Sequence, residues 1–250
     1  MSPETSDIPN VVEAVDRFRR WADAHYPGRS TDYWVFDYDG WDDLHTAVIR
    51  FLEDVPVERW TDEQTRAVLD AIHFNDEHLY LAPEIARRWP GLLIPLAEAT
   101  MTFTSGDAAR WQLAEQLGLM QDAHDDHRRL LLKFASDDEE YVRRKALEAL
   151  ARLESPATEN LALRAWSEMG DAQEYSRMTA LWALHRIGSS HLSPLLAEAE
   201  RTQTEYLAKY AAKIRRGEVD DAAARPATDA ENGTGPMMRQ QSTSKTDTAA

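Results

Sequence analysis

Two histidine-containing segments hold residue types that could ligate a metal. His124 and His127 enclose two aspartates, which would place nitrogen and oxygen donors on one helical turn. His73 and His78 flank Asn75-Asp76-Glu77 in a similar way. Such donors suit zinc or a harder divalent cation. Neither segment supplies a complete ligand set at a specific spacing, so we interpret both as solvated helix starts and predict no metal or other cofactor.

A second candidate for chemistry is the segment Val35-Phe36-Asp37-Tyr38-Asp39-Gly40. It resembles the nucleophile motif of haloacid-dehalogenase phosphatases, in which one Asp attacks phosphate and another acts as acid and base. Trp41 stands where that family has a small β-branched residue, and no alternating strand pattern follows. Gly106-Asp107 also lacks the acidic neighbour that would bind magnesium. We therefore predict a loop with solvated aspartates.

Other enzymatic signatures are missing from the sequence. It contains no Gly-x-Ser-x-Gly elbow for a serine nucleophile and no glycine-rich phosphate loop. We predict that the chain is not an enzyme.

The composition limits the class of protein and its partners. Hydrophobic residues make up 43% of the 250 residues, and 44 acidic against 28 basic residues give a net charge of -16. That charge repels phosphate backbones, so nucleic acid is not the expected partner. The absence of cysteine excludes disulfides and thiolate metal sites. Without a secretory signal or an apolar run of about 18 residues, we expect a cytoplasmic protein with no membrane contact.

Helical periodicity runs through the chain, and no convincing strand pattern interrupts it. The first helix is expected at about residues 10–25, and the last at about 194–216. Several residues predict helix ends: Thr61 with Gln64 and Ser136 with Glu139 as capping boxes, Asn75, Ser155-Pro156 and Ser193-Pro194 as starts, and Gly170 and Gly188 as stops.

An internal repeat is the most specific signal in the sequence. Residues 141–153 read YVRRKALEALARL, and residues 175–187 read YSRMTALWALHRI, at an offset of 34 without a gap. Tyrosine, two arginines and two Ala-Leu pairs recur at matching positions. A fixed period in this range is typical of stacked helical hairpins.

These residues resemble the second helix of a short bacterial HEAT-like repeat, with Val142-Arg143 and the terminal Gly188 as matching positions. Residues 107–118 form a weaker third copy. The resemblance implies an all-α fold, an α-solenoid of stacked antiparallel hairpins. We predict three parts: an N-terminal helical cap region with an aromatic loop at 1–55, HEAT-like repeats at 56–218, and a disordered tail at 219–250, whose composition has little apolar surface to bury.

Two stripes on the second helices are expected to face opposite ways. Ala146 and Leu150, with Ala180 in the next copy, belong to the core stripe. The other stripe is expected to face away from the core and, by the resemblance, to line the concave surface where partners dock. Its candidate partner-binding residues are Tyr141, Lys145, Glu148, Arg152, Tyr175, Trp182 and Arg186. Alternatively, Trp182 packs against the last helix, near Tyr206 and Tyr210.

Aromatic residues also crowd the segment 33–41, where five of nine residues are Tyr33, Trp34, Phe36, Tyr38 and Trp41. They could plug the open end of the solenoid, which needs a cap. Alternatively, Trp34, Tyr38 and Trp41 form an exposed anchor set, because Trp and Tyr dominate interface hot spots.

The sequence therefore favours a non-enzymatic scaffold or adaptor that binds another protein. A toxin-neutralising, immunity-like role would suit the charge, because acidic inhibitors dock basic nucleases with electrostatic steering. The alternative is an enzyme resembling the alkylpurine DNA glycosylases, which also use HEAT-like hairpins. Such an enzyme needs a basic concave groove, for which Arg143-Arg144-Lys145 and the basic residues at 213–216 are candidates.

Overall fold

A computed structural model of the chain describes residues 10–27, 38–75, 80–103, 107–120, 125–168, 173–202 and 204–219. Every regular element in these ranges is a helix. The α-helices are α1 (Val11–His25), α2 (Trp41–Asp54), α3 (Asp62–Phe74), α4 (Leu81–Arg88), α5 (Leu93–Ala99), α6 (Asp107–Leu119), α7 (Asp125–Phe134), α8 (Glu140–Arg152), α9 (Thr158–Ser167), α10 (Gln173–Arg186), α11 (Leu192–Ala199) and α12 (Glu205–Arg215). Short 3-10 turns, Val57–Arg59 and Pro90–Leu92, precede α3 and α5.

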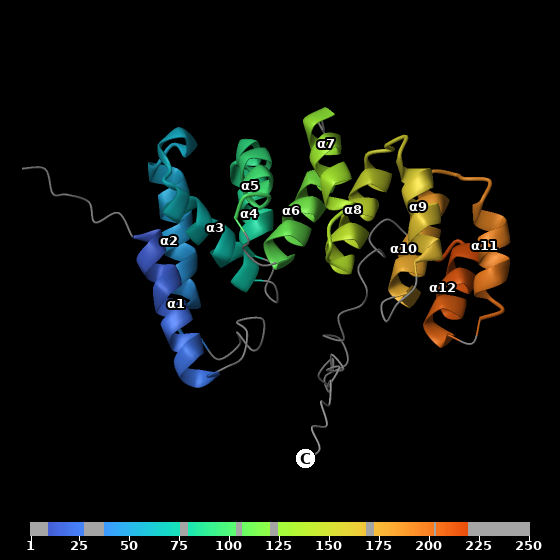
Figure 1. Cartoon of the computed structure of the whole chain (residues 1–250), viewed down its shortest axis with the longest axis horizontal. Coiled ribbons are helices and arrows are strands. Elements are labelled where there is room, and N and C mark those ends of the chain that lie inside the picture. The colour runs from blue at the N-terminus through green and yellow to red at the C-terminus, as the bar shows by residue number, and fades with distance from the viewer. Residues whose placement is uncertain are drawn as a thin grey trace, which may run out of the picture.

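The helices stack along one long axis, from α1 and α2 at one end to α11 and α12 at the other (Figure 1). Helices α6, α8, α10 and α12 form an inner row, each packed on the next. Each of them also contacts the shorter helix that precedes it in the chain, α5, α7, α9 and α11 respectively. This arrangement confirms the predicted all-α solenoid of antiparallel hairpins.

Small residues set the spacing of the inner row. A Cβ added at Gly118 of α6 would lie 2.4 Å from the Cβ of Ala149 on α8, far inside any normal contact. Ala146 and Ala180, which the repeat assigned to the core stripe, are both fully buried. Helices α6 and α8 therefore approach closely where Gly118 meets Ala149, because neither residue carries more than a methyl group there.

At the N-terminal end, α1 and α2 pack on α3 around a cluster of aromatic rings. Phe18 is its centre, with the rings of Tyr38 and Trp41 each 5.1 Å away and Phe74 at 4.6 Å. Tyr38 and Trp41 are only 7% and 9% exposed. For these two residues the structure agrees with the alternative in which the aromatic rings plug the end of the solenoid, and their burial against Phe18 contradicts the exposed anchor set. Trp34 lies outside the described residues.

Some of the predicted helix ends are confirmed and others are wrong. Thr61 and Gln64 form the expected capping box, and Asn75 accepts hydrogen bonds from the backbone of Tyr80 and Leu81 at the start of α4. The box of Ser136 with Glu139 does not form, because the Asp137 side chain accepts the Glu139 amide instead. Helices α9 and α11 begin at Thr158 and Leu192, so Ser155 and Ser193 are not their caps.

The long last helix expected at 194–216 is two helices, α11 and α12. The hydroxyl of Thr202 donates to the Ala199 carbonyl, which closes α11, and α12 restarts after Thr204. The amide of Leu207 then finds an acceptor outside its own helix, in the side chain of Glu174 at 2.8 Å.

Two inner helices end in the same way at equivalent positions. Gly188 after α10 has φ +66°, and Glu154 after α8 has φ +50°. In both places the following serine amide donates to a carbonyl five residues back, Ser155 to Leu150 and Ser189 to Leu184. The left-handed turn is thus a property of the repeat, and in the first copy a glutamate adopts a conformation that favours glycine.

The predicted division into three parts stays a prediction. One buried cluster extends from α1 to α8 without a break near residue 55, and a second joins α8 to α12. From residue 220 onward, the predicted tail lies outside the described residues.

Candidate functional site

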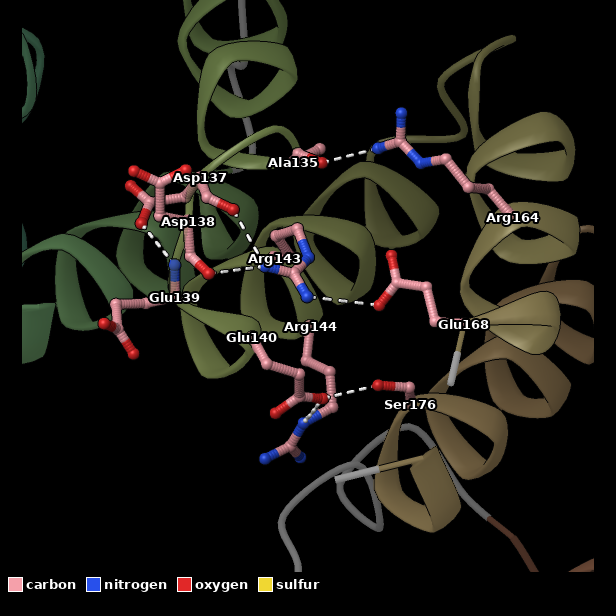
Figure 2. Close-up of polar contacts among 10 residues, drawn as sticks. All are labelled: Ala135, Asp137, Asp138, Glu139, Glu140, Arg143, Arg144, Arg164, Glu168 and Ser176. Atoms are coloured by element: carbon pink, nitrogen blue, oxygen red, sulfur yellow. Dashed lines mark hydrogen bonds and ion pairs between the residues drawn. The ribbon is translucent and has the colours of Figure 1, made fainter. Parts of the chain in front are cut away.

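The turns between hairpin helices are held by arginines at repeating positions. Arg143 of α8 donates through Nη1 to the carbonyls of Asp137 and Asp138 at 2.9 and 2.8 Å, and through Nη2 to Glu168 at 3.2 Å (Figure 2). Arg177, its equivalent in α10, donates to the Trp166 carbonyl at the end of α9. The arginine that recurs in the repeat is therefore a structural residue that satisfies free carbonyls.

Further arginines link neighbouring repeats. Arg110 of α6 pairs with Asp137 at 2.9 Å, and Arg164 of α9 donates to the Ala135 carbonyl after α7 at 2.6 Å. A cavity beside the Arg164–Ala135 and Arg143–Glu168 contacts has about 20 Å³, which is room for about one water molecule. This polar region fixes the stacking and offers no space for a small-molecule substrate.

A buried ion cluster lies on the inner row, between α6 and α8. Lys145 Nζ is 3.3 Å from Glu115 Oε1 and 3.3 Å from Glu148 Oε2, and Arg152 Nη2 lies 3.8 Å from the same Glu148 oxygen. Lys145 and Glu148 are each 3% exposed. Ions buried this deeply persist only when their partners are in place.

The surroundings shift the proton affinities of this cluster. Burial alone would lower the pKa of Lys145, but the charges of Glu148, Tyr141 and Glu115 outweigh it and raise that pKa. Burial raises the pKa of Glu148, against the opposing effect of Lys145 and Arg152. Burial likewise raises the pKa of Tyr141 and, together with the charge of Glu148, that of Tyr210.

Three candidate partner-binding residues, Lys145, Glu148 and Trp182, do not face away from the core as expected. Trp182 is 2% exposed and belongs to a cluster with Leu207 and Ile214 of α12, which agrees with the alternative that it packs against the last helix. The expectation that these three residues are exposed was wrong, because adjacent inner helices cover the polar stripe as well as the apolar stripe. The Arg152 guanidinium lies 5.3 Å from the Trp182 ring centre, and Arg186 is half-buried.

The remaining candidates, Tyr141 and Tyr175, lie in the first turns of α8 and α10, and Trp111 of α6 extends this aromatic row. Trp111 and Tyr141 meet edge to face at 5.1 Å. The Arg144 guanidinium then lies 4.6 Å from the Tyr141 ring centre and 5.4 Å from that of Tyr175, which is 36% exposed. Tyr175 is therefore the most accessible of the seven stripe residues. Partner binding by any of them stays a prediction.

The segments considered above for metal or phosphate chemistry lie partly outside the described residues. In the described ranges, no group of three or more histidine, aspartate or glutamate side chains could hold a metal ion. His124, His78 and Asp37 lie outside those ranges. No helix in the described part of the chain is long and apolar enough to span a membrane.

Comparison with protein families places part of the chain among known repeats. Residues 129–214, which contain α8, α10 and most of α12, match the family model for HEAT repeats. Comparison with curated proteins and with solved structures finds no match for the chain.

Proposed function

Because the chain is a HEAT-like repeat protein, we propose that it is a non-enzymatic scaffold that binds another protein. Stacked hairpins of this kind present extended surfaces to partners. The observation that carries the proposal is the state of the polar groups on the inner row. Lys145 pairs with both Glu115 and Glu148 inside the stack, and Arg152 lies 3.8 Å from Glu148, so we assign these groups to stability and not to a substrate pocket.

The same pairing weighs against a DNA glycosylase on this scaffold. In the basic run, Arg143 pairs with Glu168, Arg144 with Glu140 at 2.7 Å, and Lys145 with two glutamates. At the C-terminal basic group, Arg215 and Arg216 pair with Glu200 and Glu218. Cations that are already paired attract phosphates weakly, and the whole chain carries -16.

Within this proposal, a toxin-neutralising role is the specific form that the charge favours. A basic nuclease would be steered to an acidic scaffold, and its association rate would fall steeply with added salt. Adaptor roles would not require that dependence.

The test starts with the tagged full-length chain purified from its native host, followed by titration of each co-eluting protein in purified form. We expect one binary complex of micromolar affinity or better. Absence of any such complex contradicts the proposal, and release of a base from an alkylated DNA duplex by the purified chain would replace it with the enzymatic alternative.

A further inference from the structure

The first turns of three successive inner helices carry the same residue pair. Glu140-Tyr141 opens α8, Glu174-Tyr175 lies in the first turn of α10, and Glu205-Tyr206 opens α12. The bond from Leu207 N to Glu174 Oε1 holds the starts of α10 and α12 side by side. A tyrosine therefore stands at the same edge of the solenoid in each of three repeats.

Between the first two tyrosines, the chain places its own guanidinium. Arg144 lies over both Tyr141 and Tyr175, and its Nε is 2.7 Å from Glu140, which also accepts the Ser176 hydroxyl at 2.6 Å (Figure 2 shows the pair). Two aromatic rings and one carboxylate thus form a slot that a guanidinium fills. A planar guanidinium can stack on rings while its N–H groups reach a carboxylate, and this geometry suits arginine better than lysine.

One repeat further along, the position equivalent to Arg144 does not carry a guanidinium. The residue 34 positions after Arg144 is Met178, which is partly buried against the core of α10. Glu174 replaces Glu140, and it uses one carboxylate oxygen to accept the Leu207 amide. The outer ring, Tyr206, is 66% exposed, and among the residues that the structure describes no cationic side chain lies over it.

We propose that the surface formed by Tyr175, Glu174 and Tyr206 binds an arginine side chain of the partner protein. The occupied slot at Arg144 supplies the template, and Glu174 supplies the complementary charge. Tyrosine and arginine are both enriched in interface hot spots, which tend to pair with one another across an interface. The inference rests on the proposed function, since it assigns the docking chemistry of the scaffold.

The probe for the test is a pair of peptides, hexa-arginine and hexalysine, added to the isotope-labelled full-length chain at physiological salt. Hexa-arginine is expected to shift backbone amide signals at 174–178 and 205–208, with weaker binding by hexalysine. Met178→Arg fills the slot with the chain's own guanidinium and should weaken hexa-arginine binding about tenfold. Tyr206→Ala should weaken it similarly, whereas Tyr206→Phe, which keeps the ring, should not.

The reciprocal variant is a matched control. Arg144→Met empties the first slot and should add shifts at 140–144 without removing those at 205–208. Three results would overturn the inference. Met178→Arg could bind hexa-arginine as tightly as the parent does, the chemical shift changes could be confined to other regions, or both peptides could bind equally well. If a purified partner binds Met178→Arg as tightly as the parent, the slot is wrong and the scaffold proposal stands; if no partner binds either chain, the scaffold proposal itself fails.

Discussion

The two best-matched copies of the repeat, α8 and α10, share a backbone and differ in what they bury. On α8 the inner stripe carries Lys145 and Glu148, which pair inside the stack. On α10 the equivalent positions hold Thr179 and Trp182, which are 6% and 2% exposed. One copy thus satisfies buried charges and the other buries an aromatic ring. The shared Arg and Ala-Leu positions determine the stacking. The residues of the covered stripe can differ between copies, provided that any buried polar group has a partner within the stack.

The largest expected effect tests the aromatic copy. Trp182→Ala should lower the free energy of unfolding by about 3–5 kcal/mol, because it removes a buried ring from the contact with α12. Urea denaturation measures the change. Tyr206→Ala, at a tyrosine that is 66% exposed, is the control and should stay within about 0.5 kcal/mol. An unchanged Trp182→Ala would place Trp182 at the surface and restore it as a docking residue.

A similar loss is expected in the polar copy. Lys145→Met leaves the carboxylates of Glu115 and Glu148 buried without their shared cation, which should cost about 3–5 kcal/mol. The triple variant Glu115→Gln, Lys145→Met, Glu148→Leu removes the lysine and both carboxylates together and should recover part of that loss, since Arg152 keeps its charge but loses Glu148. If the single variant is as stable as the parent, the ion cluster is accessible to water and the contrast between the copies disappears.

Alkaline pH should lower the stability of the fold through three ionisable groups, Tyr141, Lys145 and Tyr210. The pKa values of Tyr141, Lys145 and Tyr210 are raised, so the folded protein holds these protons more tightly than the unfolded chain. Their stabilisation is present below their unfolded pKa values of 10.0 to 10.5 and is lost as the pH rises through the folded values.

Each such group adds up to about 1.4 kcal/mol of loss per pH unit in that window. Tyr210→Phe should therefore flatten the fall in unfolding free energy above pH 10, as measured by urea titrations from pH 8 to 11. The same slope in parent and variant would show that Tyr210 ionises freely in the folded protein.

The smallest expected effect comes from substitutions at the ends of α8 and α10. Glu154→Gly should stabilise the protein by about 0.5–1 kcal/mol, because φ +50° suits glycine better than glutamate. Gly188→Ala should destabilise it by a similar amount at φ +66°. Thermal denaturation of both variants measures the difference, and changes of the same sign would mean that the two turns are not equivalent.

The sequence predicted the stacked hairpins well because their signals are local. The spacing of Ala146 and Ala180, the box at Thr61 and the stop at Gly188 need no knowledge of neighbouring helices. The burial of the polar stripe could not be predicted from the sequence. Helical periodicity places Lys145 on the polar stripe of α8 and Trp182 on the equivalent stripe of α10, but it does not show that α6 covers the first and α12 the second. The Glu-Tyr pairs that begin at residues 140, 174 and 205 could have predicted a row of tyrosines along one edge of the solenoid. The repeat alignment used only the first two tyrosines and did not include the glutamates.

The bond from Leu207 N to Glu174 also bears on how the molecule opens. It ties the first turn of α12 to a side chain of α10, so α12 on its own lacks an acceptor for one of its first amides. Fraying of α10 at its start would release that amide too. The C-terminal hairpin is therefore expected to exchange its amide hydrogens together with α10 as one cooperative unit, and repeats added or removed at this end would have to carry their own helix start.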